Sequence, residues 1–282
     1  ICNPQDSGKI EETVTEGGAA APSNALLPTV LAAGDEVAPS WTYDAERQTL
    51  TCTVDGTTIP LDNVTADSTN LTIGKNVLNA YLNNINSMDL TGTITDNAGT
   101  TYTITAIGED AFNGYSNFTT ITLPDRLKSI GDSAFSGCTG LTSITLPDSV
   151  TSIGRRAFSG CTSLTSITLP DSLESIGDFA FNGCTSLTSI DLPESLTDVD
   201  SSAFYGCSKL TEIRVAEGNT NFAVVDGVLF NANKTTLISY PAGKTGTSYI
   251  VPDTVTSIGD FAFNGAGLTS ITLPANLETV SY

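Results

Sequence analysis

The chain has 282 residues, of which 39% are hydrophobic and only 15% are charged, so it holds enough apolar residues for a packed core and too few charges for a disordered acidic tail. Its 31 acidic residues outnumber its 11 Lys and Arg residues, and the resulting net charge of −20 disfavours nucleic acids and anionic membrane surfaces as partners. No apolar run is long enough to span a bilayer, so we expect no membrane insertion of this segment.

The first 40 residues are rich in Gly, Ala, Glu and Pro and show no sustained period, which is typical of a linker or leader arm. The chain opens at Ile1 without a Met, which indicates a mature or trimmed form. Residues 1–40 therefore contribute no expected element to the fold.

Residues 41–100 are predicted to form a small β-rich N-terminal cap. Thr49–Val54 and Thr57–Leu61 flank an Asp55-Gly56 turn and predict a β-hairpin. Leu90–Ile94 and Thr101–Ile104 flank a second turn, at residues 96–99, and Asn76–Ile85 predicts a short helix. A cap of this kind would cover the open end of a repeat stack.

From residue 101 to residue 282 the sequence repeats with a period of 23 residues. The period is marked by an Ala-Phe pair that ends at Phe112, Phe135, Phe158, Phe181 and Phe204. Within one unit, Leu141 to Leu146 alternates like a strand, Pro147 ends it, and Val150 to Ile153 predicts a second extended piece. Ala157-Phe158 then predicts a short helical turn or tight coil that returns the chain. Such units bury their apolar faces only by stacking, so we predict a β-rich, right-handed leucine-rich-repeat solenoid.

The period breaks after Phe204, because the next Ala-Phe pair ends at Phe263, 59 residues later rather than 46. We predict an expanded repeat at about residues 215–252, with a hairpin turn at Asp226-Gly227. Residues 237–241 are interpreted as a degenerate copy of the first strand of the unit. The chain ends at Tyr282 in mid-repeat, so we expect the natural protein to continue.

The unit Leu-x-x-Ile-x-Leu-Pro-x-x-Leu/Val-x-x-Ile-Gly-x-x-Ala-Phe-x-Gly-Cys resembles the BspA-like leucine-rich repeat, from about Thr101 to the C-terminus. The Asp226 to Phe230 insert with Tyr240-Pro241 is also similar to that family. The resemblance implies an extracellular protein, secreted or on a bacterial surface, that acts in adhesion to host matrix proteins, co-aggregation or host-cell attachment. It implies no shared catalytic residues.

A row of cysteines also follows the period. Its members are Cys138, Cys161, Cys184 and Cys207. A metal ladder or disulfides are the functional interpretations, but Tyr115 and Ala266 occupy the same position in other units and can pack without ligating. We therefore predict four free, buried thiols. Cys2 and Cys52 could pair with each other or be free.

A row of acidic residues follows each repeat proline. Its members are Asp125, Asp148, Asp171 and Glu194. One row supplies too few converging oxygens for calcium, and an acidic residue after Pro favours a turn. His is absent, which removes the most frequent general base and metal ligand. We therefore expect no metal, no cofactor and no catalytic activity.

The outward positions of the first strands form the predicted binding face. These positions are Thr122, Ser143, Thr145, Ser166, Thr168, Ser189, Asp191, Glu212 and Arg214. The change from hydroxyl to charged residues near Asp191 to Arg214 is the preferred contact. A flat, ice-ordering Thr array is disfavoured by solenoid curvature and by the interruption after Phe204.

The predicted function is an adhesion module that binds a protein or glycan on a host or neighbouring cell. Two alternatives remain at this point. The chain could be a passive spacer that holds another domain off the cell surface, or an accessory module of a carbohydrate-active enzyme.

Overall fold

A computed structural model describes residues 40–54, 57–75 and 86–281. The predicted leader arm, the Asp55-Gly56 turn and the helix predicted over residues 76–85 lie outside these ranges, apart from Ser40, where the first strand begins. Within the described residues all regular elements are strands, β1 to β24, joined by turns.

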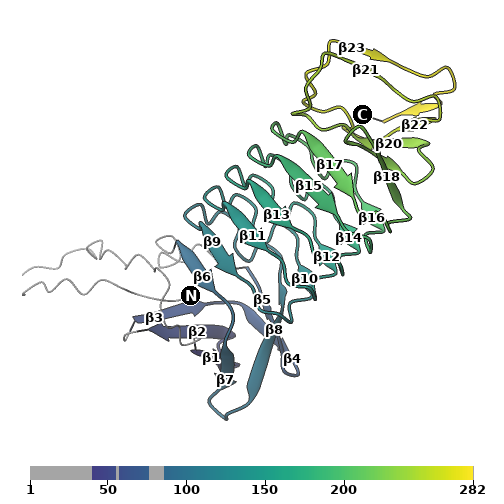
Figure 1. The fold of residues 1–282 in the computed structure, drawn as a ribbon. Coiled ribbons are helices and arrows are strands. Elements are labelled where there is room, and N and C mark those ends of the chain that lie inside the picture. The colour runs from purple at the N-terminus through teal and green to yellow at the C-terminus, as the bar shows by residue number, and fades with distance from the viewer. Residues whose placement is uncertain (1–39, 55–56, 76–85, 282) are drawn as a thin grey trace, which may run out of the picture.

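Short parallel strands stack into two ladders that run the length of the repeat region (Figure 1). The front ladder contains β6 (Ser87–Asp89), β9 (Thr120–Thr122), β11 (Ser143–Thr145), β13 (Ser166–Thr168), β15 (Ser189–Leu192) and β17 (Glu212–Val215). The rear ladder contains β8 (Thr101–Ile107), β10 (Ser129–Ile130), β12 (Ser152–Ile153), β14 (Ser175–Ile176) and β16 (Asp198–Val199). The two ladders correspond to the two extended pieces predicted in each unit.

The register of the ladders follows the 23-residue period. Ser143 pairs with Ser166 and Ile144 with Ile167, one repeat apart. Ile144 is buried between exposed Ser143 and Thr145, because successive side chains of a strand point to opposite faces. One face of each ladder therefore fills the core and the other faces solvent.

Tight turns, not helices, return the chain in each repeat. The Ala134 N–H donates to Gly131 O, and the Phe135 N–H donates to Ala157 O of the next repeat. The repeat phenylalanines stack in the core at centroid distances of 5.4–5.9 Å, from Phe112 through to Phe204. Each return therefore carries its own turn bond and a bond and a ring contact to its neighbours.

The glycine that begins each return permits this close stacking. A Cβ atom on Gly131 would lie 2.7 Å from Gly108 C and 2.9 Å from Ile107 O, both backbone atoms of the preceding repeat. We expect Gly131→Ala to lower the free energy of unfolding by about 1–3 kcal/mol, because the two repeats must separate to admit the methyl group. Gly267→Ala is the matched control, since no atom lies within 4 Å of its built Cβ. Urea unfolding of both variants tests this, and equal losses would contradict it.

The N-terminal region extends both ladders. It contains β1 (Ser40–Asp44), β2 (Thr49–Val54), β3 (Thr57–Leu61), β4 (Val64–Asp67), β5 (Asn70–Ile73) and β7 (Thr93–Asp96). β2 and β3 pair antiparallel, as do β7 and β8, so both predicted hairpins are present. β5 pairs with β8 in the rear ladder and β6 pairs with β9 in the front ladder. We propose that residues 41–100 act as a cap, since these strands cover the edge of the first repeat.

An inserted hairpin interrupts the stack after β17. β18 (Phe222–Val225) and β19 (Val228–Asn231) pair antiparallel around the predicted Asp226-Gly227 turn. β20 (Thr236–Ser239) follows, and its partners are β19 and β22 (Ser257–Ile258). The remaining strands are β21 (Ser248–Ile250), β23 (Ser270–Thr272) and β24 (Thr279–Val280).

The interpretation of residues 237–241 as a copy of the first strand was wrong. β20 pairs in parallel with β22, and the Gly259 N–H donates to Leu237 O as the Gly177 N–H donates to Ile153 O. Leu237 therefore occupies the rear-ladder position. The Tyr240 N–H donates to Ala262 O, so Tyr240 takes the place of the repeat phenylalanine two residues early.

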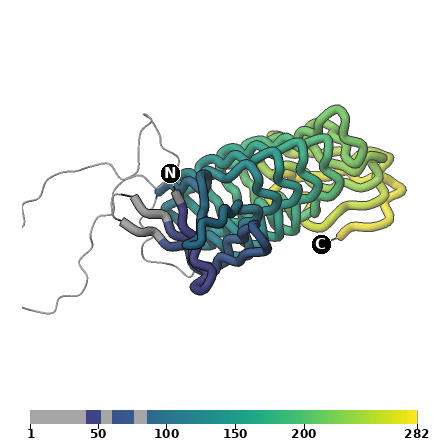
Figure 2. The backbone as a smooth tube through the Cα atoms, turned by 90° about the horizontal axis from the view of Figure 1, so that it is seen from below, coloured from purple at the N-terminus to yellow at the C-terminus, as the bar shows by residue number. Residues whose placement is uncertain are grey.

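The inserted β19 divides the interior into two cores. Leu229 packs into the main core with the repeat phenylalanines, while Val228 and Phe230 pack into a smaller C-terminal core. Because alternate residues of one strand face opposite sides, β19 forms a wall between the two cores. The repeat coils lie between the N-terminal region and this C-terminal block (Figure 2).

The two blocks still meet along the edge formed by the returns. The Gly206 N–H donates to Asn264 Oδ1 at 3.2 Å. The rings of Phe179, Tyr205 and Phe261 pack together there, with centroid distances of 5.1–5.7 Å. The insertion therefore separates the blocks at the front ladder while the returns stay in contact.

Candidate functional site

The nine predicted binding residues lie in register along the outward side of the front ladder. Seven of them are exposed, and Ser189 and Glu212 are half-buried. Asp191 pairs with Arg214 and Ser189 with Glu212 across β15 and β17. The structure thus places all nine on one continuous strip, and their role in binding remains a prediction.

The N-terminal half of this strip is uncharged. A shallow hollow of about 310 Å³ lies over β9 and β11, where Thr122, Ser143 and Thr145 line it. The neighbouring row of threonines serves the fold instead, since the hydroxyl of Thr165 donates to Thr142 O and that of Thr142 donates to Thr119 O. The hydroxyl groups near this half thus divide between packing of the ladder and the open face.

The C-terminal half ends in a cluster of charged side chains, Asp191, Glu212 and Arg214. Arg214 Nη1 donates to Asp191 Oδ1 at 3.1 Å, and Nη2 donates to Glu212 Oε2 at 2.6 Å. The bond to Glu212, followed by that to Asp191, raises the pKa of Arg214. Two carboxylates and one guanidinium leave the cluster with a net charge of −1 and fix the side chains relative to each other.

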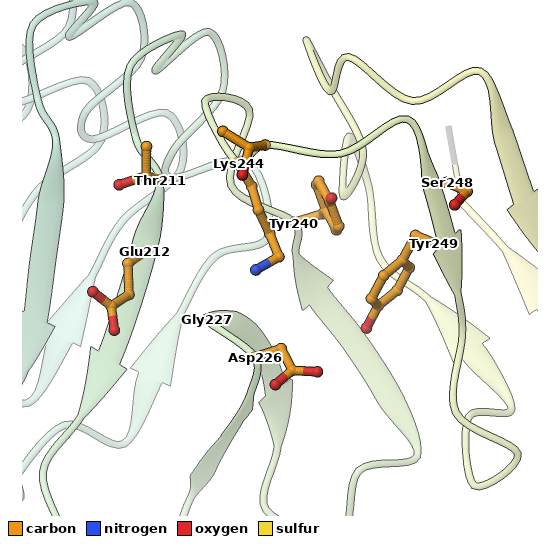
Figure 3. A pocket seen from close by; sticks show the side chains of 9 residues that line it. Thr211, Glu212, Asp226, Gly227, Tyr240, Lys244, Ser248 and Tyr249 are labelled. Carbon is orange, nitrogen blue, oxygen red and sulfur yellow. The ribbon is translucent and has the colours of Figure 1, made fainter.

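A pocket opens directly beyond this cluster, between β17 and β21 (Figure 3). Its volume is about 520 Å³, and it is lined by Thr211, Glu212, Asp226, Gly227, Tyr240, Lys244, Thr245, Ser248 and Tyr249. Of these, only Glu212 belongs to the strip predicted from the sequence. The available signal was the 59-residue spacing, because extra chain at one point of a regular stack must displace the next strand.

The cysteine row lies in the core and contributes nothing to this face. Cys138, Cys161, Cys184 and Cys207 are buried and unpaired. The Cys161 thiol donates to Phe135 O at 3.2 Å, and the other three make the equivalent bond. Burial raises the pKa of each thiol, to about 12 for Cys138 and Cys207, so the nucleophilic thiolate is suppressed.

The acidic row forms turns. The Val150 N–H donates to Pro147 O across Asp148, and the same bond recurs at Leu127 and Leu173. In the described part of the chain, no three Cys, Asp or Glu side chains gather in a way that would hold a metal ion.

A family profile described as the BspA type leucine-rich repeat region matches six copies, over residues 105–234 and 242–282. These residues make up more than half of the chain. The chain belongs to the BspA-type leucine-rich-repeat family.

Solved structures share the fold of this BspA-type chain. The pneumococcal vaccine antigen PcpA is 24% identical with a TM-score of 0.62, over 84% of this chain and 66% of that one. A leucine-rich-repeat protein from Eubacterium ventriosum is also 24% identical, with a TM-score of 0.52, over 82% and 59% of the two chains. A Treponema pallidum leucine-rich-repeat protein is 25% identical, with a TM-score of 0.50, over 78% and 81%. The chain thus spans less than two thirds of the first two proteins.

A search of curated proteins finds no match. Across residues 40–54, 57–75 and 86–281 of this BspA-type chain, no helix is long and apolar enough to cross a membrane. The family and the solved relatives therefore establish a leucine-rich-repeat stack, and the partner has to be argued from the front ladder.

Proposed function

We propose that this BspA-type chain is a binding module of a secreted or surface-attached bacterial protein, which attaches to a protein or glycan on a host or neighbouring cell. One observation carries the proposal. The front ladder exposes a bland hydroxyl strip that ends in the fixed Asp191–Glu212–Arg214 cluster beside a pocket. Binding sites typically place a few oriented polar groups in a concave region.

The chemistry of the chain supports binding in preference to catalysis. The sequence has no His, and the buried thiols stay protonated, so the usual nucleophile pairs are missing. The likeness to a pneumococcal vaccine antigen agrees with exposure on a bacterial surface.

The charged cluster gives a direct test on immobilised matrix proteins and mucosal glycans at physiological salt. We expect saturable binding by the 282-residue chain, and at least tenfold weaker binding after Arg214→Gln, because the guanidinium is lost and both carboxylates are released. The melting temperature should stay unchanged, since exposed ion pairs contribute little stability. Surface plasmon resonance and circular dichroism measure the two quantities.

Asp148→Asn is the matched control, because Asp148 is an exposed carboxylate in a turn away from the cluster. Retained affinity in the Arg214 variant would reject the cluster as the contact. Absence of binding to every surface in the panel would instead support a passive spacer.

A further inference from the structure

We propose that the pocket between β17 and β21 binds one neutral sugar residue of a glycan. This inference rests on the proposed binding function and names the ligand class at the C-terminal end of the same face. It combines the origin of the pocket with the chemistry of the groups that line it.

The inserted hairpin creates the pocket and supplies part of its lining. In the regular stack, front-ladder strands follow one another directly, as Ser143 pairs with Ser166. After β17 the ladder stops, and the next pair is β21 with β23. The turn of the hairpin docks in this gap, where the Ile213 N–H donates to Gly227 O at 3.2 Å. Because the returns on the edge still touch through Gly206 and Asn264, the pocket has fixed walls.

Charged and hydrogen-bonding groups converge on this space from four segments. The Lys244 side chain points into it between Glu212 and Asp226, and the Tyr249 ring stands on the opposite wall (Figure 3). Among the described residues, no carboxylate oxygen lies within 4.0 Å of Lys244 Nζ, so the ammonium group is directed into the pocket without an ion pair. Glu212 uses Oε2 to accept from Arg214.

The phenol of Tyr249 keeps its proton at neutral pH. Partial burial, followed by the charges of Tyr240 and Asp226, raises the pKa of Tyr249 to about 12. The hydroxyl can therefore both donate and accept a hydrogen bond, while its ring offers an apolar surface.

The balance of charge selects a neutral polar ligand. Glu212 and Asp226 repel an anion, as does the net charge of −20 of the whole chain. A cationic side chain would meet the ammonium group of Lys244 in the same space. An apolar ligand would bury two carboxylates and an ammonium group without partners, which is costly. Adjacent hydroxyls of a sugar donate to carboxylates and accept from Lys and Tyr, so they satisfy all of these groups together.

The size of the pocket agrees with this class. Its volume of about 520 Å³ lies within the range of roughly 300–1,000 Å³ that small-ligand sites occupy. The open side faces the same solvent as the hydroxyl strip, so a longer glycan can continue along the front ladder.

The test uses the 282-residue chain and the methyl glycosides of glucose, galactose, mannose and N-acetylglucosamine as probes. Saturation-transfer NMR and calorimetric titration should show saturable binding of at least one of them. Asp226→Asn and Lys244→Gln should each weaken that binding at least tenfold, while the control Asp148→Asn stays within twofold. Asp226→Asn preserves the hairpin, because Asn-Gly is favoured in this turn, and melting temperatures verify folding.

Two results would overturn the inference. One is the absence of saturable binding by all four glycosides, and the other is glycoside binding that either pocket variant leaves unchanged. An arginine-rich peptide that binds in place of the glycosides and is lost in Asp226→Asn would reassign the pocket to a cationic ligand. If matrix binding still depends on Arg214 while no glycoside binds, only the sugar inference falls. If glycosides bind while the Arg214 variant keeps its matrix affinity, only the proposed cluster falls.

Discussion

Replacing Phe158 by alanine is expected to lower the free energy of unfolding by about 3–5 kcal/mol. The Phe158 side chain is fully buried, and its ring stacks between those of Phe135 and Phe181 at 5.4 and 5.6 Å with interplanar angles of 6° and 4°. Backbone bonds hold the repeats on both sides at a fixed spacing, as in the bond from the Phe158 N–H to Ala180 O. The neighbours therefore cannot collapse into the space that the ring vacates.

Two other phenylalanines calibrate this effect. Phe204 ends the parallel stack and has one stacked partner, Phe181 at 5.9 Å, so Phe204→Ala should cost less than Phe158→Ala. Phe261 is 41% exposed on the edge of the returns, and its removal should cost less again. Urea unfolding followed by circular dichroism measures all three variants. A loss below about 1 kcal/mol for Phe158→Ala would show that the repeats relax around the cavity.

The regular part of this fold could be predicted from sequence because a strict period repeats one environment. Once Phe158 and Ile144 are assigned to the core of one unit, the same assignment holds 23 residues away in either direction. The cysteine row followed from the same logic, since Tyr115 and Ala266 at equivalent positions indicated packing. The resemblance to BspA-like repeats added the family, which the profile match confirms.

The interruption could not be predicted in detail, because its pairing is decided by contacts through space. Leu237 begins a short apolar run that suits either ladder, and only its pairing with Ile258 assigns it to the rear ladder. The N-terminal region shows a similar limit. Leu90 was expected to begin a hairpin strand, but its N–H donates to Thr122 O at the end of the front ladder.

The candidate site was predicted in part for the same reason. The outward direction of Asp191 and Arg214 follows from strand alternation, which sequence shows directly. Lys244 and Tyr249 resemble ordinary surface residues in the sequence, and they face Glu212 only because the hairpin displaces β21 from β17. A break in a repeat period is therefore the sequence feature to examine for a pocket in such stacks.

Alkaline pH is expected to destabilise the protein steeply through its four buried thiols. Burial raises the pKa of each thiol above the ordinary value of 9.0, to about 12 for Cys138 and Cys207. Below pH 9 the thiols are protonated in both the folded and the unfolded chain, so they add no pH dependence. From pH 9 toward pH 12 the unfolded chain releases protons that the folded chain retains, and the free energy of unfolding falls as pH rises.

The size of the effect follows from proton linkage. Each thiol costs about 1.4 kcal/mol per pH unit in this window, so four thiols together remove roughly 5 kcal/mol by pH 10. Urea unfolding at pH 7, 8, 9 and 10 in the presence of a reductant measures the slope. Raised pKa values of Tyr43, Tyr240 and Tyr249 act in the same direction and must be separated from the thiols.

A variant with all four cysteines replaced by alanine makes that separation. Alanine already stands at the equivalent position as Ala266, so the repeat accepts it. This variant should keep only the tyrosine contribution, and the single Cys184→Ala should reduce the slope by one proton. Equal slopes in the natural chain and the cysteine-free variant would show that the thiols ionise in the folded state. In that case water would reach the core between the repeats, and the stack would be looser than its hydrogen bonds from Cys161 to Phe135 and from Cys184 to Phe158 indicate.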